Sequence, residues 1–128
     1  MTTHHVAYAV DEDYWLPLYV SIHSLLANNR DLSLHVHVLH ADRDETFFDT
    51  LPRLDAVHDD AIVEGVSVDA GSFATAPTPH WFTRANVYRF LLPEVLPAQV
   101  DTVLYLDCDT VVDGSLAPLF DCDLGDSV

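Results

Sequence analysis

Two carboxylates separated by one residue, Asp107 and Asp109, directly follow an apolar run at residues 103–106. The continuous apolar run, which begins with a valine, predicts a strand buried on both faces, so that Asp107 lies where the backbone leaves the core. At positions i and i+2, the two side chains point the same way if the chain stays extended. Carboxylate oxygens suit Mg²⁺ or Mn²⁺ shared with a phosphate-bearing substrate, so we expect a hard-cation site here.

The composition of the chain weakens any single match of this kind. The chain has 21 acidic residues, and about two Asp-x-Asp triplets are expected by chance, so each triplet taken alone favours a solvated charge pair. Strand context distinguishes Asp11 and Asp107, because each directly follows an apolar, β-type run. Asp42 and Glu45 are instead spaced like the capping box of a helix start. The four triplets are Asp11/Asp13, Asp42/Asp44, Asp107/Asp109 and Asp121/Asp123, the last of which we place in a turn.

The elements that must position these carboxylates alternate between strands and helices. Apolar periodicity predicts strands at residues 5–10, 33–40, 62–68 and 103–106, helices at about 15–29, 42–58 and 80–92, and a loop at 70–79. This order predicts an α/β fold with a mostly parallel sheet flanked by helices, in which ligands gather at the carboxyl ends of strands. Asp11 and Asp107 both follow such ends. The length predicts a single domain over residues 1–128.

Histidines recur in the second predicted strand. Apolar residues of the 33–40 segment alternate onto one face, and His35, His37 and His40 lie on or near the other. Three histidines invite a metal site. Strand alternation alone, however, places polar residues on one face without any ligand role, and we favour that interpretation.

The charge balance excludes some partners and indicates an environment. The formal net charge is −16, and all five basic residues are arginine. The absence of lysine beside this charge predicts adaptation to high salt, which screens self-repulsion. No basic stripe exists to neutralise phosphates, so nucleic acid is not expected as a partner. No apolar run is long enough to span a membrane, and the first residues do not resemble a signal peptide, so we expect a soluble, cytoplasmic protein.

The two cysteines, Cys108 and Cys122, are each flanked by two aspartates. They lack the His or Cys companions that a zinc site needs, and an intracellular setting disfavours a disulfide. We expect both to be small, partly buried spacers.

Four segments, in their order and spacing, resemble glycosyltransferase family 8, which includes glycogenin and the bacterial lipopolysaccharide galactosyl- and glucosyltransferases. They are Tyr8-Ala-Val-Asp-Glu-Asp-Tyr14, Ser21-Ile-His-Ser-Leu25, Tyr88-Arg-Phe-Leu-Leu-Pro93 and Val103-Leu-Tyr-Leu-Asp-Cys-Asp-Thr-Val-Val112. The resemblance implies a GT-A fold, which is a Rossmann-like α/β sheet, and transfer of a hexose from a UDP-sugar with retention of anomeric configuration.

The resemblance also implies a role for each residue of the donor site. Asp107 and Asp109 would hold Mn²⁺ (or Mg²⁺), which grips the diphosphate of the nucleotide sugar and neutralises the leaving group. Arg89 would reach the diphosphate or the donor sugar as a catalytic cation, since a guanidinium is a fork-shaped partner for phosphate. The alternative for Arg89 is a salt bridge that orders Asp107.

The resemblance implies that the segment after the first predicted strand binds the nucleotide part of the donor. By the same resemblance, Asp11 would contact the uracil or the ribose, and Tyr14 would lie against the base. Asp13 stands where the family has an Asn or Asp near the nucleotide.

Family members continue beyond the point that corresponds to Val128, with acceptor-binding residues and a later His that completes the metal shell. No histidine of this chain follows Asp109. The resemblance therefore covers an N-terminal nucleotide-sugar-binding half, incomplete at its C-terminus. We expect an exposed sheet edge that a partner chain or self-association covers. The acceptor, a glycan, lipid or protein, is not specified.

Other protein classes that use spaced aspartates fit less well. A phosphatase or phosphotransferase of the haloacid dehalogenase type needs Thr two positions beyond the second Asp, where Val111 stands. A calcium-binding loop needs an oxygen ligand and a Gly where Val111 and Val112 stand, and a bidentate Glu at Pro118. A non-catalytic nucleotide-sugar-binding remnant, or a subunit-like half that keeps the donor site without acceptor chemistry, stays open as the alternative.

Overall fold

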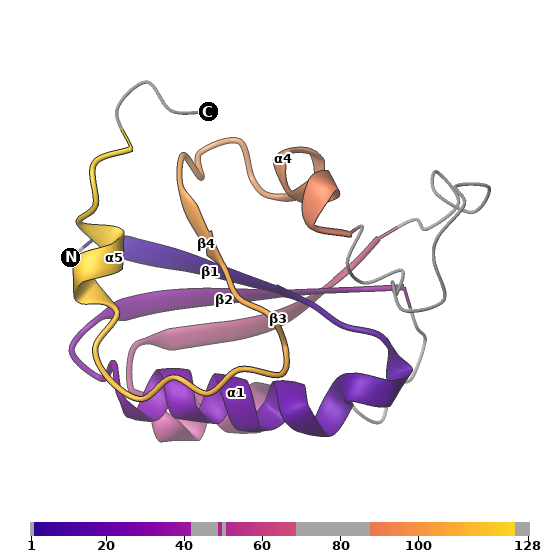
Figure 1. Ribbon diagram of the computed structural model, residues 1–128, viewed down its shortest axis with the longest axis horizontal. Coiled ribbons are helices and arrows are strands. Elements are labelled where there is room, and N and C mark those ends of the chain that lie inside the picture. Colours follow the sequence, from indigo (N-terminus) through magenta and orange to yellow (C-terminus); the bar gives the residue numbers. More distant parts are fainter. Residues whose placement is uncertain (1, 42–48, 50, 69–87, 125–128) are drawn as a thin grey trace.

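The computed structural model describes residues 2–41, 49, 51–68 and 88–124, and it contains one parallel sheet (Figure 1). Its strands are β1 (Thr3–Ala9), β2 (Ser33–His40), β3 (Ala61–Ser67) and β4 (Val103–Tyr105). They lie in the order β3-β2-β1-β4, and each neighbouring pair is parallel. The predicted parallel α/β sheet is therefore confirmed.

Helices cover both faces of this sheet. Figure 1 shows α1 (Trp15–Ala27) along one face and α4 (Leu92–Val95) on the other. The shorter elements are the 3₁₀ helices η1 (Glu12–Tyr14), η2 (Leu51–Val57) and η4 (Arg89–Leu91), and the helix α5 (Ala117–Phe120). Within the described residues, no helix has the length and apolar character that a membrane crossing requires.

The helix α1 forms where the apolar spacing predicts it. Leu18, Ile22 and Leu25 recur at helical intervals and are fully buried against the sheet. Pro17 lies in the first turn, where its missing N–H is one that the helix would leave unpaired. Asn28 ends the helix, and its backbone N–H bonds the carbonyl oxygens of Ser24 and Leu26.

Strand alternation divides the core into two clusters. Val6 and Tyr8 of β1 face the α1 side, whereas Ala7 and Ala9 face the side of α4. The α1 side also contains Leu34, Val36, Val38, Leu51, Leu54 and Val63. Full burial of one such aliphatic side chain stabilises a fold by about 1.5–3 kcal/mol, so this larger cluster holds α1 against the sheet.

The second predicted helix, at residues 42–58, differs from the structure in its described part. Residues 42–48 and 50, including the expected capping box, lie outside the described residues, and Leu51–Val57 is a 3₁₀ helix. Leu51 and Leu54 are nevertheless buried, as the apolar pattern requires. The reason is that a period of three residues also brings residues 51, 54 and 57 to one side.

The third predicted helix, at residues 80–92, is described only from Tyr88 onward, and the predicted loop at 70–79 lies outside the described residues. Its predicted end at residue 92 is wrong, because η4 passes directly into α4, which ends at Val95. Pro93 occupies the second position of α4, where its missing N–H breaks no helical hydrogen bond.

The strand β4 is shorter and less buried than predicted. It ends at Tyr105, and its three residues are half-buried rather than buried on both faces. The physical reason is its position, since β4 pairs only with β1 and forms an edge of the described sheet.

Candidate functional site

The strand order defines one special position at the carboxyl end of the sheet. The chain proceeds from β1 outward through β2 and β3, and then β4 pairs on the other side of β1. Ligands of open parallel sheets bind outside the carboxyl ends at such a switch point. Asp11 follows β1 and Asp107 follows β4, so the two strands that flank the switch point each deliver a carboxylate.

The charges of three carboxylates act on the thiol of Cys108. Burial, followed by the negative charges of Asp109, Asp11 and Asp107, raises the pKa of this thiol to about 11. The Cys108 side chain is half-buried and packs against the α1-side core. Asp107 and Asp109 are exposed, and Asp11 is partly exposed. The structure thus places Asp11, Asp107 and Asp109 within electrostatic reach of one thiol, without bringing all three into one close cluster.

The backbone between Asp107 and Asp109 is not extended. The sequence-based expectation that the two side chains point the same way required an extended backbone. Residues 108 and 109 form a turn, and the Thr110 Oγ1 donates a hydrogen bond of 2.8 Å to the carbonyl oxygen of Asp107. A hydroxyl that bonds the backbone three residues earlier stabilises a tight turn. Cys122, in contrast to the half-buried Cys108, is exposed, so its expected partial burial is wrong.

Hydroxyl groups connect this turn to the core. The Tyr8 hydroxyl lies 2.9 Å from the Ser21 Oγ, which lies 3.3 Å from the Thr110 Oγ1. Tyr8 belongs to β1 and Ser21 to α1, so the turn after β4 is tied to both neighbours. Burial raises the pKa of Tyr8 to about 12, which keeps this phenol in its hydrogen-bonding form.

The segment that follows the turn is fastened along α1. Figure 1 shows the chain running from β4 along this helix before it reaches α5. The backbone N–H of Val112 donates to the Ser24 Oγ at 2.8 Å, and the Asn28 amide donates to the Val112 carbonyl at 2.8 Å. The buried Asn29 amide donates to Gly114 at 3.2 Å and accepts from the Leu116 N–H at 2.7 Å.

From the sequence, Asn28 and Asn29 were expected to end the helix, and Ser21 and Ser24 belong to one of the four motif segments, but their bonds to the segment after β4 were not predicted. Ser21, Ser24 and Asn28 lie three and four residues apart, so they form a polar stripe on a helix that is otherwise apolar on its inner side. That stripe was the available signal, because buried polar side chains of a helix need partners from another segment.

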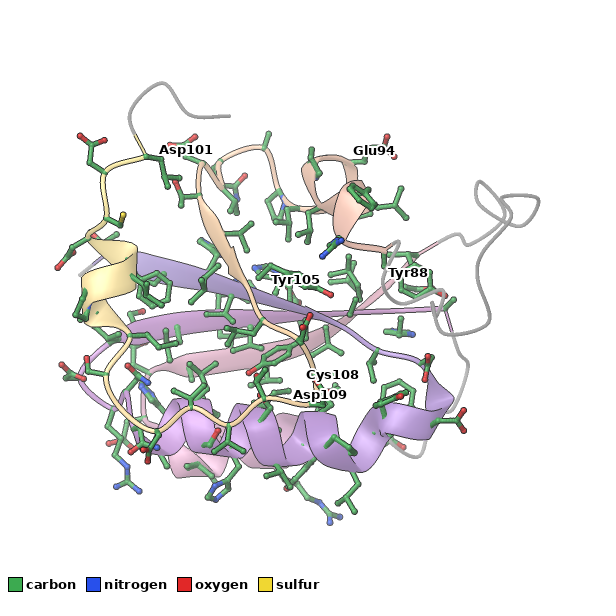
Figure 2. All side chains as sticks on the ribbon, in the orientation of Figure 1. Tyr88, Glu94, Asp101, Tyr105, Cys108 and Asp109 are labelled. Atoms are coloured by element: carbon green, nitrogen blue, oxygen red, sulfur yellow. The ribbon has the colours of Figure 1, made fainter. Side chains whose placement is uncertain are left out.

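The Tyr105 phenol is influenced both by Asp107, at the start of the turn after β4, and by Arg89, the predicted catalytic arginine. Burial raises the pKa of its phenol to about 12; the charge of Asp107 also raises the pKa and that of Arg89 lowers it. Figure 2 shows Tyr105 on β4, above the sheet, with Cys108 and Asp109 beside α1 where the chain turns. Arg89 and Asp107 therefore both lie within electrostatic reach of one ring.

Arg89 is exposed, and its guanidinium carbon lies 5.2 Å from the centroid of the Phe90 ring. No ion pair joins Arg89 to Asp107, although the structure describes both residues, so the salt bridge considered as its alternative role is not formed. Among the described residues, no carboxylate forms an ion pair with this guanidinium.

The remaining predicted residues lie on η1, directly after β1. The Asp11 Oδ1 accepts a hydrogen bond of 3.2 Å from the backbone N–H of Asp13, which caps this 3₁₀ helix. Asp13 is exposed, and 39% of Tyr14 is exposed. The Tyr14 ring thus offers an open surface near the carboxylates.

A hollow of about 290 Å³ lies elsewhere, between α4 and the start of β4. Leu92, Leu96, Asp101 and Val103 are among the residues that line it, and none of the predicted site residues does. Its apolar walls suit side-chain packing rather than a charged diphosphate.

Comparison with known proteins places these features in a family. The model for glycosyl transferase family 8 matches residues 5–128. Glycosyltransferase GlyF of Streptococcus pneumoniae is 35% identical over 120 residues, which cover 93% of this chain and 29% of GlyF. A lipopolysaccharide 1,2-glucosyltransferase of Escherichia coli is 27% identical over 124 residues, which cover 97% of this chain and 36% of that protein.

The fold comparison agrees. The crystal structure of galactosyltransferase LgtC in complex with donor and acceptor sugar analogs matches with a TM-score of 0.83 and 31% identity, covering 95% of this chain and 44% of that one. This match and the parallel sheet confirm the GT-A fold. The chain spans 29% and 36% of the length of the two curated relatives above. As the resemblance of its motifs implied, the chain belongs to glycosyltransferase family 8.

Proposed function

We propose that this chain binds a UDP-sugar together with Mn²⁺, as the donor-binding part of a hexosyltransferase that retains anomeric configuration. The observation that carries the proposal is that the adjacent strands β1 and β4 lead to Asp11 and to Asp107 and Asp109 at the switch point of the sheet, where the charges of all three reach Cys108. Three carboxylates alone repel a diphosphate, so a bridging cation is what makes the site compatible with this donor.

The donor set fits a hard cation. Asp107 and Asp109 offer exposed carboxylate oxygens, which Mg²⁺ and Mn²⁺ prefer. In the part of the chain that the structure describes, no further His, Cys or carboxylate completes a close cluster with them. Such ions are commonly held by one or two carboxylates, with substrate phosphates in other positions. When bound, the cation would stabilise the negative charge that builds on the departing diphosphate.

The other site residues would hold and orient the donor. The exposed ring of Tyr14 would stack on the uracil, and Asp11, beside it, would accept hydrogen bonds from the ribose or the base. Arg89 would bind the diphosphate or the sugar as a catalytic cation, because it has no carboxylate partner among the described residues. Asp13 would lie near the nucleotide.

We assign the whole segment 1–128 to one nucleotide-sugar-binding domain, and the acceptor is a glycan, lipid or protein hydroxyl. The relatives named above act on sugars by their names, and LgtC was crystallised with donor and acceptor sugar analogs. Donor choice depends on few pocket contacts, so glucose and galactose are both candidate sugars.

The chain contains its own matched control for the metal ligands. The tripeptide Asp-Cys-Asp occurs twice, at Asp107/Asp109 and at Asp121/Asp123. Calorimetry in molar KCl should show UDP binding that requires Mn²⁺. The double substitution Asp107→Asn/Asp109→Asn should abolish it, and Asp121→Asn/Asp123→Asn should leave it unchanged. Metal-dependent binding that survives the first pair, or is absent from the unmodified chain, would contradict the donor site.

Turnover separates transfer from binding alone. Release of UDP from UDP-glucose or UDP-galactose by this chain, with Mn²⁺, supports a transferase. Binding without any release favours the alternative of a non-catalytic nucleotide-sugar-binding half.

A further inference from the structure

Three imidazole rings form a compact cluster on the sheet, and Asp11, Asp107 and Asp109 are not part of it. They belong to His5 of β1 and to His35 and His37 of β2. One ligand nitrogen from each ring lies within 4.8 Å of the others. The His5 Nδ1 and the His37 Nε2 are 3.0 Å apart, and the ring centroids of His35 and His37 are 4.1 Å apart.

The strand register explains why these rings meet. His5 pairs with His35 across β1 and β2, and His37 pairs with Ala7. The methyl group of Ala7 leaves room for the His37 ring to lean toward His5. His40, which the sequence grouped with these histidines, is not a member of the cluster, whereas His5 from another strand is.

A carboxylate of the third strand supports two of the rings. Glu64 of β3 pairs with His37, and its Oε1 lies 2.7 Å from the His35 Nε2 and 3.6 Å from the His37 Nδ1. If the Glu64 carboxylate accepts a hydrogen bond from His35, the Nδ1 of that ring keeps its lone pair. Metal-binding histidines are commonly oriented in this way by a carboxylate on the second nitrogen.

Burial favours the neutral form of two of the rings, His5 and His37. Burial, followed by the charges of His35 and His5, lowers the pKa of His37 to about 4. Burial also lowers the pKa of His5, and the charges of His35 and His4 lower it further. The 3.0 Å contact between the His5 and His37 nitrogens holds one proton between two lone pairs. A cation that takes the place of this proton requires the donor ring to carry its N–H on the other ring nitrogen.

We propose that His5, His35 and His37 bind one divalent transition-metal ion of the Zn²⁺ class, with Glu64 orienting the ligand rings. Imidazole nitrogens suit Zn²⁺ better than the hard cations of the carboxylate turn. Zn²⁺ holds such nitrogens at about 2 Å in a tetrahedron, so they lie roughly 3.3 Å apart, close to the separation of the His5 and His37 nitrogens. The ion would join β1 to β2, and through Glu64 it would engage β3.

Binding requires one rearrangement, because a metal lies in the plane of each ligand ring and stacked rings cannot share it. His37 is almost fully buried, with 1% of its side chain exposed, whereas 20% of the His35 side chain is exposed. Binding would therefore turn His35, the more exposed ring, out of its stack on His37, and the half-exposed Glu64 carboxylate would have to follow it. The cluster lies beside Val103, the first residue of β4, and so precedes the carboxyl ends of the strands that carry the donor site.

Calorimetric titration of the metal-stripped chain with Zn²⁺ tests this proposal. Excess Mg²⁺ occupies the oxygen-ligand sites, and a Cys122→Ala background removes the exposed thiol. We expect one Zn²⁺ per chain and a Zn²⁺-dependent rise in Tm. His35→Gln and His5→Gln should each weaken binding at least about tenfold, and His23→Gln, on the exposed side of α1, should not change it.

A spectroscopic readout identifies the ligands independently of affinity. Co²⁺ in place of Zn²⁺ should give the visible absorption of a tetrahedral nitrogen site, and His35→Gln should remove it. Glu64→Gln should weaken Zn²⁺ binding by about tenfold, because the carboxylate that orients the His35 ring is lost. Binding that is absent, that is unchanged in both histidine variants, or that is lost in Asp107→Asn/Asp109→Asn would overturn the proposal. UDP binding in the histidine variants reports on the donor site separately.

Discussion

At the scale of single residues, the charged side chains of the site shift the pKa values of two neighbouring neutral groups, the Cys108 thiol and the Tyr105 phenol. The thiol of Cys108 responds to Asp109, Asp11 and Asp107, and the phenol of Tyr105 responds to Asp107 and Arg89. Each carboxylate disfavours a second negative charge beside it, which raises the pKa of the thiol and of the phenol. The same repulsion makes the turn receptive to a cation.

The reactivity of Cys108 should therefore be low and should depend on Asp109. A pKa raised to about 11 leaves a thiolate fraction at pH 8 roughly a hundredfold below that of a thiol with a pKa of 9. In a Cys122→Ala background, alkylation by iodoacetamide, followed by mass spectrometry, should be slow. Asp109→Asn should accelerate it several-fold, because one negative charge is removed. Asp121→Asn is the matched control, and equal acceleration by both substitutions would contradict a local effect.

At the scale of elements, α1 positions the carboxylate turn as well as packing against the sheet. Its inner residues are buried in the core, and its polar stripe together with Asn29 holds residues 110–116, through one bond to the Thr110 hydroxyl and further bonds to the backbone. Most of these bonds join segments more than 80 residues apart. Secondary structure alone would leave the segment after β4 without backbone partners, since β4 ends at Tyr105.

Substitution of Asn28 and Asn29, one at a time, should show how much burial adds to the stabilising effect of their hydrogen bonds. Asn29 is fully buried and bonds Leu25, Gly114 and Leu116. Asn29→Ala should lower the free energy of unfolding by about 1–3 kcal/mol or more, since buried groups lose their partners. Asn28→Ala, at an exposed position, should cost less than about 1 kcal/mol, because water replaces its bonds. Urea denaturation measures both, and equal losses would show that burial does not decide the cost.

At the scale of the whole molecule, charge is the dominant property. A net charge of −16 on 128 residues acts against any compact state in dilute buffer. The acidic groups at the switch point add to this repulsion locally. A cation-rich solution reduces both effects, because the Debye length falls from about 10 Å at 0.1 M to about 3 Å at 1 M salt.

The stability of the chain should rise with salt. Between about 0.1 and 2 M KCl we expect Tm to increase by several degrees, as relief of about 1 kcal/mol corresponds to roughly 4 °C in a domain of this size. Circular dichroism would follow the transition. Sucrose at matched osmolality serves as the control for general exclusion of cosolutes. A Tm that is constant in KCl, or that rises equally in sucrose, would contradict adaptation to high salt.

Local chemistry determined much of this protein from sequence. Apolar periodicity predicted all four strands and α1, and the strand before Asp107 distinguished that triplet from the others. These properties are local, because the period of a strand or helix is written in consecutive residues. Element ends were less well predicted, as at Val95, where a proline begins a new turn instead of ending the helix.

The tertiary structure alone decided which residues meet. Only the strand order β3-β2-β1-β4 makes the strands before Asp11 and Asp107 neighbours, and only the register of β1 on β2 joins His5 to His35 and His37. The partner of a parallel strand lies beyond a crossover, so neither its identity nor its register follows from the strand's own residues. The amino-acid sequence by itself determined the chemical groups and the elements that carry them. Their convergence into a carboxylate turn and a histidine cluster depended on long-range packing that no local pattern records.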